Sequence, residues 1–392
     1  MKKVLALSTS YPLRPESISG VFVHSLYKAM ANSWSIDVLC PDDSRPSGGI
    51  LDGITVTPVR YMPKQLQVLG GAGGILPSLK LHPFKALLLP MLLISMLFHA
   101  LIKARSVCLI HANWAICGII GAVAGRLYGK PVVLTLRGSD VEKACRSTIF
   151  RWQLRAAVAG SDYTVCVSEA MMRRVVELFP HHAGKLGYCH NGVDDLFFSA
   201  RRAAPGPDSS LRVMAVGALI PVKGFDVLLR ALKSLTPHLA IQTTIVGEGP
   251  ERSNLQARIA EYGLESMVVL QGEVAHENMP ALMAGYDVFV LSSHAEGRPN
   301  VVVEAVAAGL PVISSDLPGV GGLVVAGDNG WLYPKGDARA LAEVLVEAMS
   351  ARTELPDMGR RGRERIRVQG SWATTARYYD NLFRTLVAGG TP

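Results

Sequence analysis

The stretch that decides the fold is Glu296-Gly297-Arg298-Pro299-Asn300-Val301-Val302-Val303-Glu304, which sets two carboxylates eight positions apart. Pro299 suits the first turn of a helix, because its ring presets φ and its missing N–H would be unpaired there. Gly309 supplies the stop that follows. The pattern predicts a strand-to-helix loop with Glu296 and a helix with Glu304 about one turn from its start. Backbone N–H groups between them would face an anionic ligand.

The spacing alone fits an ordinary strand-loop-helix unit with two solvated glutamates equally well. The wider stretch from Glu296 to Val312, however, resembles the signature of glycosyltransferase family 4, Glu-Gly-x-Pro-Asn-x-x-x-Glu-Ala-x-Ala-x-Gly-x-Pro-Val. The resemblance extends over almost the entire chain, through Tyr11-Pro12, Gly20-Val21-Phe22-Val23, Arg137-Gly138-Ser139-Asp140, Asn191-Gly192-Val193-Asp194, Gly217 to Gly224 and Val246-Gly247-Glu248-Gly249-Pro250. It implies the α/β GT-B fold, with two doubly wound Rossmann-like domains facing a central cleft.

Length and apolar runs support two domains independently. A chain of 392 residues exceeds the usual size of a single core, about 250–300 residues. Runs rich in Val, Ile and Leu indicate parallel strands buried on both faces. We expect strands at Val4–Thr9, Ile36–Cys40, Ile54–Arg60, Val107–His111, Pro131–Leu136 and Tyr163–Val167, and again at Val213–Gly217, Ile241–Val246, Met267–Gln271, Val288–Leu291 and Pro311–Ser314.

These runs, read with the resemblance, divide the chain into four parts. Residues 1–194 form an acceptor-binding Rossmann-like domain, and residues 195–210 form a polar linker. Residues 211–370 form the nucleotide-sugar-binding domain. Residues 371–392 form a helix that the resemblance implies crosses back to the first domain.

Charge is distributed unevenly along the chain. Residues 1–205 hold 23 Lys and Arg against 12 Asp and Glu, and residues 206–392 hold 17 against 20. The basic half indicates an anionic partner, either nucleic acid or an acidic membrane surface. No basic run interleaved with aromatics and no zinc-finger spacing occurs, which favours the membrane and no nucleic acid. The six cysteines include no C-x-x-C pair, as expected for reduced thiols in the cytoplasm.

An apolar stretch of seventeen residues, Ala86–Ile102, lies between Lys85 and Lys103. A membrane span needs about 20 residues, so the stretch is at the short limit. A helix packed in the core, a helix partly immersed in a bilayer and a true span all remain open. Gly70–Gly74 indicates a loop nearby. We expect a peripheral protein on the inner face of the cytoplasmic membrane.

Donor chemistry requires positive charge where the leaving diphosphate gains negative charge. A divalent metal or fixed donors such as Lys and helix N-termini can supply it. The chain has no Asp-x-Asp motif at a strand end, so we assign this role to Lys223 and the helix start at Pro299–Val301. We expect no metal and no cofactor, with a UDP- or GDP-sugar as donor substrate. The family's Arg after the glycine is Ala218 here, and Arg298 could substitute for it.

The resemblance also implies roles for the two glutamates. Glu304 would accept hydrogen bonds from the ribose hydroxyls, and Glu296 would contact the transferred sugar near its anomeric carbon. Retention in this family proceeds by front-face attack without a protein nucleophile. The donor-binding set is Glu304, Lys223, Arg298, Pro299, Asn300, Val301, Gly217 and Glu248, and the catalytic set is Glu296, Arg137 and Lys223.

Arg137 marks the acceptor side, with Gly20, Gly138 and Asp140. The family often has His where Arg137 stands. Arginine cannot act as a base at neutral pH, but it can bind a phosphate bidentately. A glycan acceptor linked to a polyprenyl pyrophosphate would suit it. Arg137 could instead cap a loop.

The predicted function is a retaining hexosyltransferase of polysaccharide biosynthesis, of exopolysaccharide or surface-glycan type. Two other hypotheses remain open. One is a nucleotide-sugar epimerase on the same fold, and the other is a non-catalytic nucleotide-sugar-binding partner in a glycan assembly complex, which the departures at Ala218 and Arg137 keep open.

Overall fold

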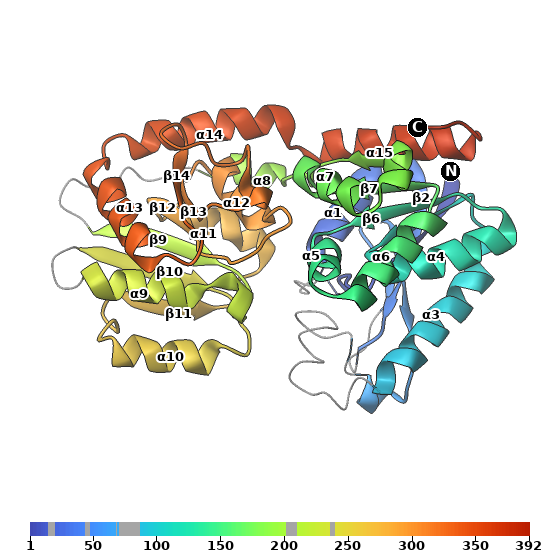
Figure 1. The fold of residues 1–392 in the computed structure, drawn as a ribbon, viewed down its shortest axis with the longest axis horizontal. Coiled ribbons are helices and arrows are strands. Elements are labelled where there is room, and N and C mark those ends of the chain that lie inside the picture. Colours follow the sequence, from blue (N-terminus) through green and yellow to red (C-terminus); the bar gives the residue numbers. More distant parts are fainter. Residues whose placement is uncertain (15–19, 44–47, 68, 70–86, 201–209, 236–239) are drawn as a thin grey trace. The chain divides into compact units, whose positions relative to one another are not determined.

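The computed structural model divides the chain into two compact domains. The first comprises Met1–Gly192 with Trp372–Pro392, and the second comprises Val193–Ser371 (Figure 1). The residues described are 1–14, 20–43, 48–67, 69, 87–200, 210–235 and 240–392. The predicted loop Gly70–Gly74 lies outside them. Each domain is a sheet of mainly parallel strands covered by helices, which confirms the predicted α/β class with two Rossmann-like domains.

The first domain is built on an eight-stranded sheet. At one edge, the strand Gly49–Leu51 pairs antiparallel with the strand Ile54–Val59, and the other neighbouring strands pair parallel. The order reverses between β1 and β5, which is the switch point where doubly wound sheets bind ligands. In spatial order the strands are β3 (Gly49–Leu51), β4 (Ile54–Val59), β2 (Trp34–Pro41), β1 (Lys2–Leu7), β5 (Leu109–Asn113), β6 (Val132–Leu136), β7 (Tyr163–Cys166) and β8 (Leu186–Tyr188).

Alternate residues of β1 enter two different cores, as expected when successive side chains point to opposite faces of a sheet. Leu5 and Leu7 pack under α3 (Leu89–Ala104), α4 (Ala115–Tyr128), α5 (Ser139–Arg146), α6 (Thr148–Gly160) and α7 (Glu169–Leu178). Val4 and Ala6 pack on the other side with α1 (Val21–Met30) and α15 (Trp372–Val387). The sheet is therefore buried on both faces.

The second domain has six strands, all parallel, in the order β11 (Val268–Gly272), β10 (Ile241–Val246), β9 (Leu211–Val216), β12 (Val288–Leu291), β13 (Val312–Ser315) and β14 (Gly330–Tyr333). The order reverses between β9 and β12. Its helices are α8 (Asp195–Phe198), α9 (Phe225–Leu235), α10 (Arg252–Glu261), α11 (Met279–Met283), α12 (Asn300–Ala307), α13 (Ala338–Ser350) and α14 (Leu355–Gln369). Short 3-10 turns include Pro221–Lys223 and His276–Asn278.

Several predicted elements need correction. The strand expected at Val107–His111 is Leu109–Asn113, because the polar His111 and Asn113 are buried and continue the ladder with β6. Within the linker expected at 195–210, residues 195–198 form α8, with Phe197 fully buried in the core of the second domain, and residues 201–209 lie outside the described part of the chain. The short strands β3, β8 and β14 were not predicted.

Two helices bear on function. Helix α15 packs against α1. It also contacts the start of β2, where the indole of Trp34 donates to Asp380 over 2.7 Å. Helix α3 covers most of the apolar stretch, although Ala86 lies outside the described residues. Its buried stripe is Leu92, Met96, Ala100 and Ala104, so one face belongs to the core. Among the residues described, no helix is long and apolar enough to cross a membrane.

Candidate functional site

The loops after β9 and β12 meet at the switch point of the second domain. Lys223 Nζ donates to Glu296 Oε1 over 2.6 Å, and Ser293 Oγ donates to the same oxygen over 2.7 Å. The Lys223 and Glu296 side chains are 21% and 13% exposed, so little water screens the pair. The structure thus brings together two of the three predicted catalytic residues.

Close backbone packing holds these two loops in place. Gly224 has a φ of 62°, and a Cβ there would lie 2.2 Å from the carbonyl oxygen of Ser292. The hydroxyl of Ser292 donates to the Lys223 carbonyl over 3.0 Å. Any larger residue at Gly224 would therefore separate the loops. Gly217 directly follows β9, and it packs against the methylene groups of the Lys223 side chain.

Helix α12 begins at Asn300, and Glu304 is well inside it. Pro299 is the N-cap residue with ψ of 105°, so it precedes the first turn instead of occupying it as expected. Because α12 follows β12, its start lies at the carboxyl edge of the sheet. Arg298, Asn300 and Val301 are all partly buried around this start.

The side chain of His276 contacts the carboxylate of Glu304, a contact that the sequence analysis did not predict. His276 Nε2 lies 3.1 Å from Glu304 Oε1, and Phe197 makes an edge contact with the imidazole ring. Burial lowers the pKa of His276, but the hydrogen bond and charge of Glu304 outweigh burial, so the pKa is raised above its ordinary value. Glu304 therefore has a cationic partner at mildly acidic pH.

Glu248 sits apart from this cluster. Its Oε1 accepts from Arg252 Nη1 over 2.6 Å, one helical turn away, and the side chain is 42% exposed. The backbone of the same residue is more firmly placed, because the Glu248 carbonyl accepts from the Leu219 N–H over 2.9 Å. The structure therefore ties Glu248 to the loop after β9 through its main chain.

Arg137 follows β6 in the first domain. Nε and Nη2 both donate to Asn113 Oδ1, over 3.1 and 2.6 Å, and Nη1 donates to Asn191 Oδ1 over 2.8 Å. The guanidinium also lies over the ring of Phe22, 5.2 Å from its centroid. Burial lowers the pKa of Arg137, yet arginine stays protonated in proteins. The hydrogen bonds that its guanidinium makes to described residues all go to neutral amide oxygens.

Trp114 stands beside this arginine in a strained backbone conformation. Its φ of 68° and ψ of 151° belong to a region that residues other than glycine rarely occupy. Trp114 directly follows Asn113 at the end of β5, and its ring packs edge-on against Phe22. Strained backbone conformations of this kind are most common at functional sites, where the surrounding structure stabilises them.

The other residues predicted on the acceptor side make close contacts within the first domain. A Cβ on Gly20 would lie 2.3 Å from the Ser10 carbonyl oxygen, so only glycine fits at this position. Gly138 is the N-cap residue of α5, with φ of 117°. Asp140 accepts from the backbone N–H groups of Ala115 and Arg137, and burial raises the pKa of its carboxyl group.

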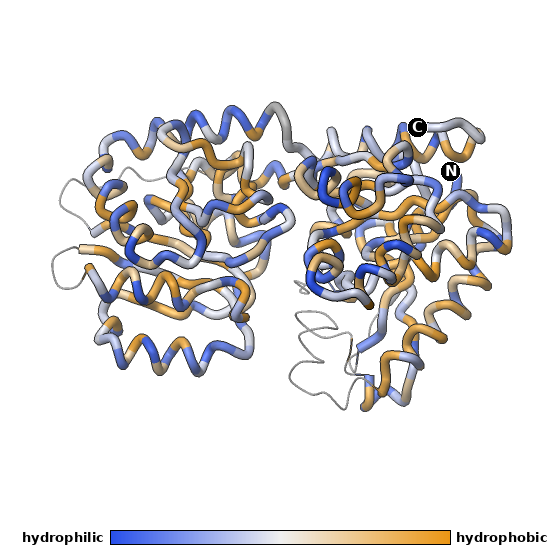
Figure 2. The backbone as a smooth tube through the Cα atoms, in the orientation of Figure 1, coloured by the Kyte–Doolittle hydropathy of each residue, from blue (hydrophilic) through white to orange (hydrophobic). Residues whose placement is uncertain are grey.

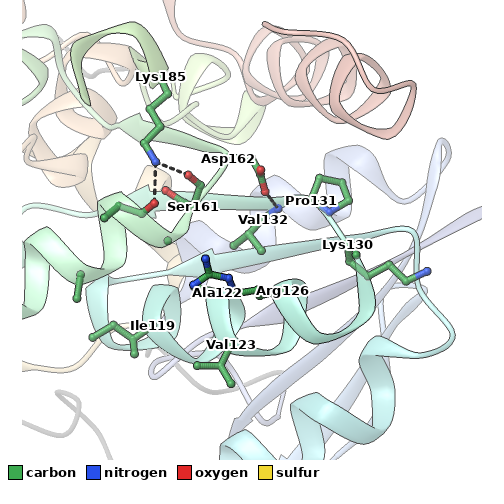
Figure 3. Close-up of a pocket in the computed structure, with 15 residues that line it drawn as sticks. Ile119, Ala122, Val123, Arg126, Lys130, Pro131, Val132, Ser161, Asp162 and Lys185 are labelled. Atoms are coloured by element: carbon green, nitrogen blue, oxygen red, sulfur yellow. Dashed lines mark hydrogen bonds between the residues drawn. The ribbon is translucent and has the colours of Figure 1, made fainter. Parts of the chain in front are cut away.

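Figure 3 shows a hollow in the first domain. The strand bounds put it at the opposite edge of the sheet from Arg137. Val132, Asp162 and Lys185 line it where β6, β7 and β8 begin. Two of its polar side chains already have partners: Lys185 donates to the carbonyls of Ala159 and Ser161, and Asp162 accepts from the Val132 N–H. Since doubly wound sheets bind ligands at the carboxyl ends of strands, this hollow is not the substrate site.

Comparison with known proteins gives the family. Residues 19–195 match the model of Glycosyltransferase Family 4, and residues 199–365 match that of Glycosyl transferases group 1. Both domains are thus accounted for, and the chain belongs to glycosyltransferase family 4, with the GT-B fold.

Individual relatives agree with this placement. WcaL of Escherichia coli K12, a glycosyltransferase assigned to colanic acid biosynthesis, is 34% identical over 190 residues, which are 46% of this chain and 47% of WcaL. The match thus spans about half of that relative. Sucrose-phosphate synthase from Thermosynechococcus elongatus superposes with a TM-score of 0.83 over 100% of both chains at 21% identity. Anabaena Alr3699/HepE, solved with UDP and glucose, gives 0.78 over 98% of this chain and 100% of that chain, at 20% identity. These two likenesses concern the fold.

Proposed function

We propose that this protein is a retaining hexosyltransferase of polysaccharide biosynthesis. It moves a sugar from a nucleotide-diphosphate donor to a glycan carried on a polyprenyl pyrophosphate. The observation that carries the proposal is the Lys223–Glu296 pair at the switch point of the second domain, within the region that matches the Glycosyl transferases group 1 model. The similarity to WcaL supports the polysaccharide setting.

Lys223 and the start of α12 are the groups suited to the donor diphosphate. A lysine ammonium has three N–H donors, and Glu296 uses one of them, so others can reach a phosphate oxygen. Helix N-termini bind phosphate through their N–H groups and dipole. We propose that these groups meet the charge that develops on the leaving diphosphate, and that transfer needs no metal ion.

The two glutamates contact different parts of the donor in this proposal. Both hydrogen bonds to Glu296 use Oε1, which leaves Oε2 to accept from a hydroxyl of the transferred sugar. Lys223 and Ser293 fix the orientation of this carboxylate near the anomeric carbon. Glu304 accepts hydrogen bonds from the ribose hydroxyls, and its carboxylate also pairs with the imidazole of His276. The acceptor hydroxyl attacks the anomeric carbon from the face that the diphosphate leaves, so retention requires no protein nucleophile. The departing phosphate takes the proton of that hydroxyl, so no protein base is required either.

Arg137 binds the pyrophosphate of the acceptor in this proposal. A buried cation held by neutral amides retains its attraction for an anion, and the guanidinium fork matches phosphate geometry. Phe22 and the strained Trp114 form an aromatic surface beside it that suits a sugar ring or an isoprenoid. A polyprenyl-linked acceptor also places the enzyme at the inner face of the cytoplasmic membrane.

A donor-binding screen tests the proposal. Purified protein is titrated calorimetrically with UDP-, GDP- and ADP-sugars, and Glu304→Gln is titrated in parallel. We expect one nucleotide class to bind, and the variant to bind it more weakly. The absence of binding by every donor would contradict the proposal. Binding of a donor without transfer to any polyprenyl-linked acceptor would support a non-catalytic partner instead.

A further inference from the structure

Three helices of the first domain present their outer faces in the same direction. Helices α3, α4 and α6 cover one face of the eight-stranded sheet, and all contribute to the core on that side. Helix α4 packs against both α3 and α6 (Figure 1). Because their inner stripes face the sheet, their outer stripes form one continuous surface away from it.

This surface carries large apolar side chains in regular array. Along α3 and the turn before it, Leu87, Met91, Ile94, Phe98 and Ile102 follow each other at intervals of three or four residues. Such spacing puts them on one stripe of the helix. Ile94 is 68% exposed and Phe98 is 60% exposed. Figure 2 shows the hydrophobic character of α3 along its length.

The neighbouring helices extend the apolar surface. Val123 and Leu127 are exposed one turn apart on α4, and Ile149 and Trp152 are exposed on the first turn of α6. Trp152 is 72% exposed. Isolated apolar residues on a surface need no explanation, but an array over three adjacent helices marks an interaction site. We call these residues together the outer apolar face.

Charge on the three helices is of one sign. Between their bounds, α3, α4 and α6 contain no Asp or Glu. Arg126 on α4 and Arg151 and Arg155 on α6 are exposed. Acidic residues return in α5, where Glu142 is paired with Arg146 over 2.9 Å. Within these three helices, the charged residues that border the outer apolar face are therefore all basic.

We propose that the outer apolar face docks on an anionic lipid bilayer. Apolar side chains with Trp, bordered by Arg and free of acidic residues, match the boundary between acyl chains and anionic headgroups. Helix α3 lies in the plane of that boundary, because its other stripe, which includes Leu92 and Met96, is committed to the protein core. The proposal assigns a surface to the membrane location given above and does not depend on the transfer chemistry.

Vesicle co-sedimentation of the full chain tests this assignment. The vesicles contain phosphatidylcholine alone or phosphatidylcholine with phosphatidylglycerol, at low and at high salt. The test variants are the double substitutions Ile94→Ser with Phe98→Ser, and Arg126→Gln with Arg155→Gln. Val269→Ser is the matched control, because Val269 is an exposed valine in the second domain, 51% exposed.

We expect wild type and Val269→Ser to sediment with the anionic vesicles. The apolar double variant should lose about tenfold or more in partition coefficient at either salt concentration. The arginine double variant should lose binding mainly at low salt, since salt screens exposed charges. Exposed substitutions rarely perturb a fold, and circular dichroism checks this. Unchanged donor titrations in all variants would separate docking from catalysis.

Three results would overturn the proposal. One is no sedimentation of wild type with anionic vesicles at low salt. Another is equal sedimentation of wild type and the apolar double variant. The third is a wild-type dimer in gel filtration that the apolar double variant converts to monomer, since the face would then belong to a second copy of the chain.

Discussion

Glu296 and Glu304 belong to the same loop-helix unit, but different neighbours hold them. Glu296 shares one oxygen between Lys223 and Ser293, whereas Glu304 pairs with His276. The first arrangement orients a carboxylate beside a cation suited to phosphate. The second places a carboxylate in a helix next to a titratable ring. Substitution of the two residues should therefore affect different steps.

Glu304→Gln should weaken donor binding about 10- to 100-fold, because it keeps the shape but removes charge-assisted hydrogen bonds of roughly 1.5–3 kcal/mol. Glu296→Ala should depress turnover more than donor affinity, because it removes the carboxylate beside the reacting carbon. Calorimetric titration and steady-state kinetics measure the two effects. Wild-type affinity in Glu304→Gln together with wild-type turnover in Glu296→Ala would contradict the assignment.

The His276–Glu304 pair should make stability depend on pH. The folded pKa of His276 is raised above its unfolded value of 6.5, so the contribution is fully present below that value and is lost as pH rises through the raised folded pKa. The unfolding temperatures of wild type and His276→Gln are measured across pH 5–9 and compared. The advantage of wild type should shrink toward alkaline pH, and a constant difference would rule out this linkage.

At the residue scale, the sequence predicted the position of a side chain best where that side chain follows a strand. Lys223, Glu296 and Arg137 all follow buried strands, and the structure puts each at the carboxyl edge of its sheet. Asn113 follows the same rule and could have been found by it. His276 could not have been found by this rule. It lies 28 positions before Glu304 in the sequence, in a 3-10 turn that no local sequence pattern indicates.

Among the elements, α15 has its polar and apolar contacts deep in the first domain. Tyr379 Oη lies 2.9 Å from Thr135 Oγ1, and Phe383 is fully buried against Trp34 and His111. A helix from the end of the chain thus completes the core on one face of the first sheet. Its loss should destabilise the domain that contains Arg137.

Phe383→Ala should lower the free energy of unfolding of the first domain by about 3–5 kcal/mol, since it removes a buried ring and leaves a cavity. Asn381→Ala, an exposed position on the same helix, is the control and should change stability by about 0.5 kcal/mol or less. Urea denaturation measures both. Equal stability of the two variants would show that α15 is not part of the folded core.

Several apolar strands were predicted with the bounds that the structure gives them, whereas β3, β8 and β14 were missed. The strands Ile241–Val246 and Val288–Leu291 have the predicted bounds, because their side chains are almost all apolar or β-branched. Strand β3 was missed, although Asp52 and Gly53, both with positive φ, form the turn that joins it to β4. Three-residue strands offer too few side chains for a period to emerge.

Over the whole molecule, each domain gathers polar groups at its own switch point. The second domain carries Lys223 with Glu296, and the first carries Arg137 with Asn113. In our proposal the donor diphosphate and the acceptor pyrophosphate are recognised separately, so a complete transfer reaction requires both domains. The excess of basic residues in the first half of the sequence is consistent with an anionic acceptor and an anionic membrane.

Turnover should survive excess chelator if Lys223 and the start of α12 stabilise the leaving diphosphate. Lys223→Ala should then lose most of its activity, and added magnesium should not restore it. Assays of nucleoside diphosphate release with and without EDTA make the comparison. A strict requirement for magnesium or manganese, recovered on titration after EDTA treatment, would contradict this part of the mechanism.

The most direct test of the central claim is the anomeric configuration of the transferred sugar. Wild-type protein is incubated with the donor it binds and a polyprenyl-pyrophosphate-linked glycan, and the product linkage is read by NMR. The account predicts that the sugar keeps the configuration it had in the donor, with release of the nucleoside diphosphate. A product of inverted configuration, or no transfer by folded protein that binds its donor, would contradict it.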